Sequence, residues 1–217
     1  MKQALITGGT RGIGRACAEA LAGAGYGLTV VSRTVEELRD MQSEWRKEYP
    51  DAPLRTIAAD LEVLRHVNAV PPGPYDLVIL NAGRYLPGRL TDEDRDVYTQ
   101  LLGLNLLANH RLARRLLPPM VTAGRGHLVV IGSTGTDHFK DHMTAYVATK
   151  YALRGLYLGL EKELATTNVR TTLVSPGATL TGSWENETPP ADILRPGAVA
   201  RVVLEAVREG RTGRITV

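Results

Sequence analysis

The sequence predicts an α/β domain in which a doubly wound sheet of about seven parallel strands carries helices on both faces. Apolar runs of strand length alternate with helix-length periodic segments from one end of the chain to the other, which is typical of a parallel sheet covered on both sides. The 217 residues suit one large domain, residues 1–217, better than two. Apolar residues make up 43% of the chain and 22 glycines supply tight turns, so the composition supports a buried core.

The order of the elements follows from the same alternation. The predicted strands are 3–7, 27–33, 54–60, 76–81, 127–133, 169–175 and 214–217. Between them the sequence predicts helices over about 13–24, 34–47, 101–120, 145–165 and 196–208. The first helix is the clearest, because Ile13, Cys17 and Leu21 recur on one face and Gly25 then ends it. Prolines interrupt the connection 61–75, so only a stub of helix fits there.

The charge pattern argues against a nucleic-acid-binding protein, because the net charge is only +3 and the basic residues are scattered. The densest basic group, Arg111, Arg114 and Arg115, is interpreted as a solvated or interface face. Cys17 lies among small apolar residues and is interpreted as a core residue, which is consistent with a reducing compartment. We find neither a signal pattern nor an apolar run of the roughly 20 residues that cross a bilayer. We therefore expect a cytoplasmic protein with no membrane partner.

A glycine-rich loop joins the first predicted strand to the first helix, and it reads Thr7-Gly8-Gly9-Thr10-Arg11-Gly12-Ile13-Gly14. Glycines let the backbone approach a pyrophosphate, whose charge then meets the free amides and the dipole at the helix start. Because strand, loop and helix stand in this order, the segment predicts the dinucleotide site of a Rossmann-type sheet. The expected cofactor contacts are Gly8, Thr10, Arg11, Gly12, Ile13 and Gly14. The alternative is that these glycines serve only the steric needs of a strand-to-helix turn.

The end of the second predicted strand indicates which dinucleotide is bound. Sheets that prefer NAD usually present an acid there to the ribose hydroxyls, whereas this strand ends in Ser32-Arg33. The Arg33 guanidinium suits a 2′-phosphate, and Arg11 adds a second positive charge. The sequence therefore predicts NADP(H), with NAD(H) as the weaker candidate. In the alternative, Arg33 is only an exposed strand-end residue, and Glu36 or Glu37 serves the ribose.

Tyr146 and Lys150 are four residues apart in a predicted helix, which places both side chains on one face. A phenol gives up its proton reluctantly at neutral pH, and a close cation favours the phenolate. Tyr146 is therefore the candidate general acid and base, and Lys150 has further donors for a ribose and for a proton supply. Ser133, at the end of a predicted strand, is the candidate donor to the substrate oxygen. The alternatives are a surface pair for Tyr146 and Lys150, and a turn or helix cap for Ser133.

These motifs together resemble the short-chain dehydrogenase/reductase family over nearly the whole chain. The glycine loop is similar to the family's T-G-x-x-x-G-x-G pattern, and Ser133 stands thirteen residues before Tyr146, as is usual in the family. The resemblance implies that Asn105 matches the family's helix asparagine, which would hold a water that continues the proton relay from Lys150. In the alternative, Asn105 is a buried polar residue that bonds to its own helix backbone.

The resemblance also implies cofactor contacts at the ends of other strands. Asp60-Leu61 resembles the Asp-plus-apolar pair beside the adenine ring, although an isolated Asp60 would be an ordinary helix cap. Asn81-Ala82-Gly83 resembles the family's Asn-Ala-Gly, and 176–181 resembles the Pro-Gly-x-x-x-Thr stretch that lies against the nicotinamide carboxamide. The implied contacts are Asp60, Leu61, Asn81, Ala82, Gly83, Tyr146, Lys150, Pro176, Gly177, Thr179 and Thr181.

The activity that the resemblance implies is NADP-dependent reduction of a carbonyl to an alcohol, or the reverse, by hydride transfer. Segments of the chain are similar to sepiapterin-reductase-like members, and the glycine loop is equally similar to 3-oxoacyl-carrier-protein reductases, so the substrate stays open. The alternative from another class is a non-catalytic NADPH-binding regulatory or redox-sensing protein, which predicts a broken catalytic set. Apolar helix faces around 101–117 and 145–160 resemble the family's subunit-pairing helices, so we expect a homodimer or homotetramer.

The substrate side departs from the family in two places. Leu80 stands where many members have a first asparagine. Only thirteen residues, 182–194, lie where many relatives carry a longer helical lid, so this short lid leaves the pocket shallow or completed by another subunit. Trp184 either stacks on a flat or apolar substrate or packs locally. The loop 137–142 should border the pocket, and because His138 and His142 lack a third ligand, no metal is expected.

Overall fold

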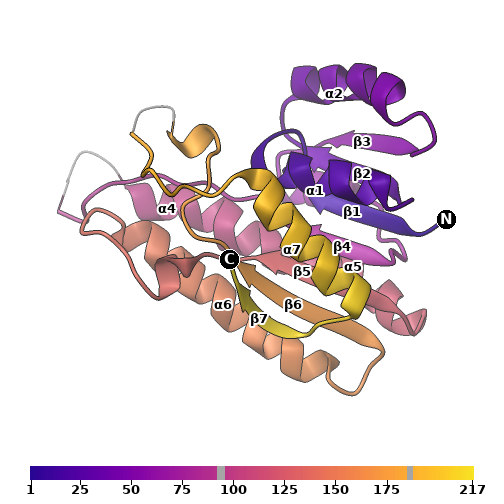
Figure 1. Ribbon diagram of the computed structural model, residues 1–217. Coiled ribbons are helices and arrows are strands. Elements are labelled where there is room, and N and C mark those ends of the chain that lie inside the picture. The colour runs from indigo at the N-terminus through magenta and orange to yellow at the C-terminus, as the bar shows by residue number, and fades with distance from the viewer. Residues whose placement is uncertain (92–95, 185–187) are drawn as a thin grey trace.

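The computed structural model describes residues 1–91, 96–184 and 188–217, and it confirms the predicted sheet (Figure 1). Within these residues, seven strands pair in parallel in the order β3-β2-β1-β4-β5-β6-β7. They are β1 (Gln3–Thr7), β2 (Gly27–Ser32), β3 (Leu54–Ala58), β4 (Leu77–Leu80), β5 (Gly126–Ile131), β6 (Val169–Ser175) and β7 (Gly213–Thr216). The chain builds outward from β1 to β3 and then returns to place β4 on the other side of β1. The point between β1 and β4 is therefore the topological switch point, beyond which such sheets bind ligands.

Helices cover both faces of the sheet (Figure 1). One face carries α1 (Gly12–Gly23), α2 (Val35–Glu48) and α7 (Pro196–Glu209), and the other carries α3 (Leu64–Ala69), α5 (Asn109–Thr122) and α6 (Thr144–Leu164). The short α3 confirms the predicted stub. No helix in the described ranges is both long and apolar enough to span a membrane.

Successive side chains of a strand point to opposite faces of the sheet, so the strands contribute to two hydrophobic cores, one on each face. Leu5 and Val130 belong to the core under α5 and α6, whereas Ile6 and Val129 belong to the core under α1 and α7. The inner strands are buried on both faces, which explains why they read as mainly apolar runs, whereas the edge strands β3 and β7 are only partly buried. Cys17 is buried in the second core, as its spacing predicted.

Five predicted strands, β2 to β5 and β7, end one or two residues earlier in the structure than the sequence suggested. Arg33, Asp60, Asn81 and Ser133 lie just beyond β2, β3, β4 and β5. For β4 the reason is a change of partner, because the Asn81 N–H donates to Thr7 Oγ1 at 3.0 Å instead of continuing the ladder. All four residues therefore lie on loops at the carboxyl edge of the sheet.

The predicted helix over 101–120 is wrong as a single regular helix. The structure divides it into α4 (Val97–Leu102), a π-helical turn η1 (Gly103–Ala108) and α5. The Asn109 side-chain amide donates to the Leu104 and Asn105 carbonyl oxygens at 3.3 and 2.9 Å, which satisfies carbonyl groups inside the bulge. Such π-helical turns are frequent at functional sites, and this one contains the candidate residue Asn105.

The basic trio on α5 is less solvated than its sequence suggested. Arg111 Nη1 donates to the Glu62 carbonyl oxygen at 3.2 Å, and Arg115 Nε donates to the Val70 carbonyl oxygen. Two of the three guanidinium groups therefore brace α5 against the chain around α3.

Candidate active site

A cavity of about 750 Å³ lies at the carboxyl edge of the sheet. It is lined by the glycine loop, by the loops that follow β2 to β6, and by the start of α6. Of the predicted cofactor and catalytic residues, Gly14 and Asn105 do not line it. The predicted residues that do are Gly8, Thr10, Arg11, Gly12, Ile13, Ser32, Arg33, Asp60, Leu61, Asn81, Ala82, Gly83, Ser133, Tyr146, Lys150, Pro176, Gly177, Thr179 and Thr181.

Backbone conformations that other residues rarely adopt shape the glycine loop. Gly8 and Gly12 have φ angles of 64° and 55°, in the left-handed region. Gly14 lies behind the loop, where a Cβ would stand 2.1 Å from the Gly8 carbonyl oxygen. Gly14 therefore permits α1 to pack against the loop and does not itself face the cavity. Because α1 begins at Gly12, the unpaired amides of its first turn lie at the cavity wall.

Asn81 joins the loop after β4 to the glycine loop. Its Nδ2 donates to the Thr7 and Gly8 carbonyl oxygens at 2.9 and 3.0 Å. Its backbone N–H and that of Ala82 both donate to Thr7 Oγ1. The loops on the two sides of the switch point are therefore held together by one amide and one hydroxyl.

Two cations stand at the end of the cavity near β2. The Arg11 and Arg33 side chains are exposed and line the cavity, and neither has an ion-pair or hydrogen-bond partner among the described residues. Beside them, Thr10 Oγ1 lies 3.0 Å from Ser32 Oγ and donates to Glu37 Oε2 at 2.6 Å. An anion bound here would meet two guanidinium groups and two hydroxyls, whereas the Glu37 carboxylate would oppose it.

Asp60 shapes a turn at the cavity wall. Its Oδ1 accepts a hydrogen bond from the Glu62 N–H at 3.0 Å, and it is not the N-cap of α3, a position held by Val63. Leu61 beside it is buried yet still lines the cavity. Glu62 Oε2 then pairs with Arg84 Nη2 at 3.1 Å, and both of these residues line the cavity too.

The structure brings Tyr146 and Lys150 together on α6, with Lys150 Nζ 5.7 Å from the centre of the Tyr146 ring. Lys150 is only 7% exposed, and its Nζ donates to the Ile131 carbonyl oxygen at 3.3 Å. No carboxylate in the described part of the chain pairs with it, so this buried ammonium keeps donors for a ligand. The Tyr85 ring packs edge-on against Tyr146, with ring centres 5.1 Å apart.

Ser133 caps a short 3₁₀ turn, η2 (Thr134–Thr136), that follows β5. Its Oγ accepts a hydrogen bond from the Gly135 N–H at 2.9 Å. Because the hydroxyl is an acceptor in this bond, its own proton remains available for another acceptor. A Cβ on Gly135 would stand 3.1 Å from Ser133 Oγ and 3.5 Å from Tyr146 Cε1, so both side chains flank this glycine. The turn role and the donor role predicted for Ser133 are compatible.

Asn105 is fully buried and connects three elements. Its Oδ1 accepts from the Arg84 N–H at 2.7 Å, and its Nδ2 donates to the Arg84 carbonyl oxygen and to Thr149 Oγ1 at 3.0 and 3.1 Å. Thr149 Oγ1 in turn donates to the Tyr146 carbonyl oxygen at 2.8 Å. The side chain thus bonds across to α6 and to the loop after β4, rather than to its own helix as the alternative interpretation required.

The loop after β6 closes another side of the cavity. Trp184, in the turn η3 (Gly182–Trp184), donates from Nε1 to the Thr179 carbonyl oxygen at 3.0 Å, while the residue also lines the cavity. Both interpretations of Trp184, local packing and substrate contact, are compatible with this placement. Residues 185–187 of the predicted lid lie outside the described residues.

Sequence reasoning missed several cavity residues. Glu62, Arg84 and Tyr85 line the cavity, and the available signal was their position directly after Asp60-Leu61 and Asn81-Ala82-Gly83. In the loop 137–142, His138, Phe139 and Lys140 line the cavity as expected, whereas Asp137 and His142 do not. His142 pairs with the neighbouring Asp141, and Asp137 pairs with Arg214 and Arg154.

Comparison with known proteins identifies the family of the chain. Residues 2–192 match the family model for short chain dehydrogenases. An uncharacterized oxidoreductase of Staphylococcus aureus (strain USA300) is 30% identical over 215 residues, covering 96% of this chain and 91% of the relative. An alcohol dehydrogenase from the archaeon Thermococcus sibiricus, complexed with 5-hydroxy-NADP, is 27% identical with a TM-score of 0.90 over 100% of this chain and 96% of that one. A short-chain dehydrogenase from Sphingobium yanoikuyae in complex with NADPH gives the same identity and TM-score over 100% and 87%.

The fold and the family match define the class of protein: the chain belongs to the short-chain dehydrogenase/reductase family of oxidoreductases.

Proposed function

We propose that this protein is an NADPH-dependent oxidoreductase that reduces a carbonyl group to an alcohol, or catalyses the reverse reaction. The observation that carries the proposal is that Ser133, Tyr146 and Lys150 converge on the same cavity as the glycine loop. One cavity thus has a phosphate cradle at one end and a hydroxyl, a phenol and an ammonium at the other. This is the set of groups that carbonyl reduction with a dinucleotide requires.

The residues present fit a nicotinamide dinucleotide. The glycine loop leaves the amides at the start of α1 uncovered for a pyrophosphate. Arg11 and Arg33 favour NADP(H) over NAD(H), because both guanidinium groups are without a protein partner in the described residues. The complexes of the two structural neighbours with 5-hydroxy-NADP and NADPH support the same preference. When bound, the nicotinamide supplies or accepts the hydride.

The proton chemistry falls to residues of the chain. In the reducing direction, the Tyr146 hydroxyl gives its proton to the carbonyl oxygen; in the oxidising direction, the phenolate takes the proton of the alcohol. The Lys150 ammonium lies 5.7 Å from the centre of the Tyr146 ring, and its spare donors hold ribose hydroxyls. The free proton of Ser133 is donated to the same substrate oxygen and orients it.

Asn105 supports this arrangement from behind. Both of its side-chain N–H bonds are used by the Arg84 carbonyl and by Thr149. A water that continues the relay from Lys150 would therefore be held by an acceptor of Asn105, either its Oδ1 or its backbone carbonyl oxygen.

The substrate end of the cavity favours a substrate with a flat or apolar part. Tyr85, Phe139 and Trp184 line it with aromatic rings, and Lys140 adds a cation. We propose that residues 1–217 act as a single domain with a short lid near 182–194, of which residues 182–184 line this end of the cavity. Three large apolar or aromatic side chains are exposed, Leu107 on η1 and Tyr151 and Leu158 on α6. They support a homodimer or homotetramer. Sedimentation of the purified protein would measure the number of subunits.

The cofactor assignment is tested by titrating the purified protein with NADPH and with NADH and following cofactor fluorescence. We expect Arg33→Ala to weaken NADPH binding by about tenfold or more, because a charge-assisted contact to a phosphate is lost. Arg39→Ala is the matched control, because Arg39 is an exposed arginine on α2 that does not line the cavity. Equal affinity of the wild type for NADH would overturn the assignment of Arg33, and absence of binding to either cofactor would overturn the proposed function.

A turnover assay with ketones and diketones distinguishes the proposed enzyme from the alternative, a non-catalytic regulatory or redox-sensing protein. NADPH binding without turnover of any carbonyl would favour the regulatory alternative. A thiol-based sensor has little support, because burial raises the pKa of Cys17 to about 12 and so disfavours the reactive thiolate.

A further inference from the structure

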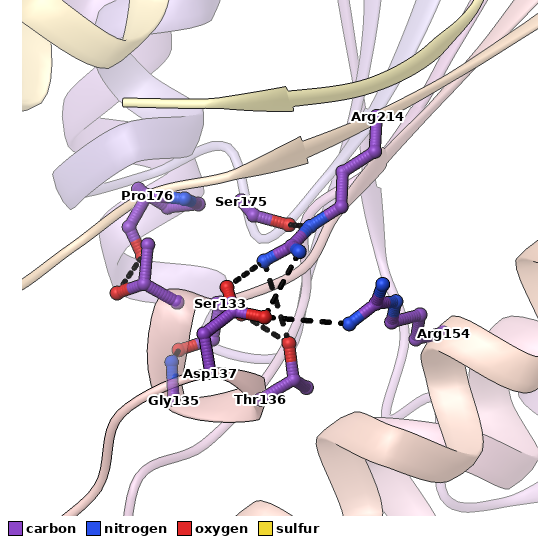
Figure 2. A network of polar contacts seen from close by, with 9 residues as sticks. Ser133, Gly135, Thr136, Asp137, Arg154, Ser175, Pro176 and Arg214 are labelled. Atoms are coloured by element: carbon purple, nitrogen blue, oxygen red, sulfur yellow. Dashed lines mark hydrogen bonds and ion pairs between the residues drawn. The ribbon is translucent and has the colours of Figure 1, made fainter.

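Arg214 connects the edge strand β7 to the turn that carries Ser133. Figure 2 shows its guanidinium pointing from β7 past Ser175 toward Asp137. Its Nε donates to Ser175 Oγ at 3.0 Å, its Nη1 donates to Asp137 Oδ1 at 3.0 Å, and its Nη2 donates to Asp137 Oδ2. Nη2 also lies 3.5 Å from Thr136 Oγ1. One side chain thus holds groups from the ends of β6 and η2, although Asp137 is 77 positions away in the sequence.

This ion pair lies at the protein surface and is made by both arms of the Arg214 guanidinium. The contact is bidentate, and the Arg214 and Asp137 side chains are only 23% and 30% exposed. The hydrogen bonds from Arg214 lower the pKa of Asp137, and the same bonds raise the pKa of Arg214. Arg154 on α6 approaches the same carboxylate at 3.4 Å (Figure 2). The planar fork of an arginine suits two parallel bonds to a carboxylate, which a lysine cannot make.

The held turn leads directly to Ser133. Thr136 Oγ1 donates to the Ser133 carbonyl oxygen at 3.1 Å, and the Gly135 N–H donates to Ser133 Oγ at 2.9 Å. The Thr134 N–H donates to the Pro176 carbonyl oxygen at 3.0 Å, which ties the turn to the end of β6 beside Ser175. Movement of Asp137 or Thr136 would therefore move the hydroxyl that accepts from Gly135.

We propose that Arg214 is a positioning residue whose fork on Asp137 fixes the 133–137 turn and so orients the Ser133 hydroxyl toward the substrate oxygen. Neither Arg214 nor Asp137 lines the cavity, so the proposed effect acts through the turn that carries Ser133 and not through direct contact of these two side chains with a ligand. The inference rests on the proposed function, because orientation of Ser133 matters only if Ser133 donates to a reacting oxygen.

The kinetic test compares Arg214→Met, Arg214→Lys and Asp137→Asn with a matched control, Arg211→Met. Arg211 lies two residues before β7 and forms an exposed ion pair with Glu209 at 2.5 Å. We expect Arg214→Met to lower kcat by about tenfold, with the NADPH Kd unchanged, because a small displacement of a positioned donor is costly. Arg214→Lys should recover less than half of this loss, and Arg211→Met should have no effect. A wild-type kcat in Arg214→Met, or an equal fall in Arg211→Met, would overturn the proposal.

A second comparison asks whether Arg214 acts through Ser133. In a Ser133→Ala background, Arg214→Met should cause no further loss of kcat, because residues that act as a unit are not additive. An additional tenfold loss in this background would mean that Arg214 acts by another route, and the inference would fall.

Amide hydrogen exchange gives a readout that needs no turnover. In Arg214→Met and in Asp137→Asn, the amides of Gly135 and Thr136 should exchange faster than in the wild type, while Arg211→Met leaves them unchanged. Unchanged exchange in both variants contradicts the inference whatever the activity of the protein. Faster exchange in the two variants, together with a wild type that turns over no carbonyl, contradicts the proposed function alone, since the turn is then held as inferred but serves no reaction.

Discussion

Polar groups at the two edges of the sheet differ in how many of them have hydrogen-bond partners within the protein. At the amino edge, protein partners satisfy them: Asp76 accepts from the Gln3 N–H at 2.8 Å and from Arg125 at 3.0 Å, and His127 Nε2 lies 2.7 Å from Thr172 Oγ1. At the carboxyl edge, Lys150 and the cations near β2 keep unused donors that face a cavity. A buried or half-buried group without a full set of partners costs stability. We infer from this difference that the amino edge contributes to stability and that the carboxyl edge is the one open to a ligand.

The largest expected effect compares two tyrosines on α6, Tyr146 at the cavity and Tyr157 in the core. Tyr146→Phe should lower kcat by about 10³-fold, because the general acid and base is removed while the ring packing against Tyr85 remains. The melting temperature should stay unchanged. Steady-state kinetics and thermal unfolding of the same preparation measure both quantities.

Tyr157→Phe is the matched control for that substitution. Tyr157 lies on the same helix but is buried, and its hydroxyl donates to Glu161 at 2.8 Å. Removing this hydroxyl should cost about 1 kcal/mol of stability without changing kcat. A large loss of kcat in Tyr157→Phe, or none in Tyr146→Phe, would break the assignment of the two tyrosines.

The next effect tests the amino edge through pH. Burial, followed by the charge of Arg170, lowers the pKa of His127 to about 4, whereas an unfolded histidine titrates near its ordinary value of 6.5. The unfolded chain therefore binds the extra proton first, and stability from this group is complete above about pH 6.5 and is lost as the pH falls toward 4. The loss should be on the order of 3 kcal/mol.

Urea unfolding at pH 7 and at pH 4.5 measures that loss. In His127→Gln, the fall in unfolding free energy between the two pH values should shrink, while NADPH binding at pH 7 is unchanged. His138→Gln is the control, because His138 is exposed at the other edge of the sheet and should leave the acid slope as it is. An undiminished slope in His127→Gln would show that other groups carry the acid sensitivity.

Gly14 is a position at the carboxyl edge where one substitution should lower both stability and cofactor binding. Gly14→Ala places a Cβ 2.1 Å from the Gly8 carbonyl oxygen and 2.6 Å from Asn81 Nδ2, so we expect a loss of about 1 to 3 kcal/mol of stability together with weaker NADPH binding. Gly23→Ala, at the other end of the same helix, meets no atom within 4 Å and should be neutral or slightly stabilising. Chemical denaturation and cofactor titration of both variants decide this, and equal stability of the two variants would contradict the packing role.

The smallest expected effect concerns the Glu37 carboxylate, which accepts a hydrogen bond from Thr10 beside Ser32. Glu37→Gln should raise the affinity for NADPH relative to NADH by about threefold, because a negative charge beside Thr10 and Ser32 is removed. Glu36→Gln is the control, since Glu36 is exposed and does not line the cavity. Fluorescence titration of both cofactors gives the ratio. A variant that loses NADH binding alone would instead support the alternative in which Glu37 serves the ribose.

Local spacing predicted much of this protein. Each of these signals is local in the sequence: the glycine loop, the Tyr146 and Lys150 pair, and each separate apolar run. A strand or a helix then places the residues of each signal by its own geometry. The boundaries were less predictable, because side-chain bonds such as that from Asn81 to Thr7 Oγ1 end a strand earlier than its apolar run does.

The sequence by itself determined the fold class, the family and most of the predicted residues at the cavity, since these depend on periodicity and on short motifs. Only the tertiary structure decided that Gly14 packs behind the loop, that Asn105 joins Arg84 to Thr149, and that Arg214 holds Asp137. The physical reason is that these contacts depend on which strands and helices become neighbours. No local pattern records a hydrogen bond between residues that only the order of the sheet brings together.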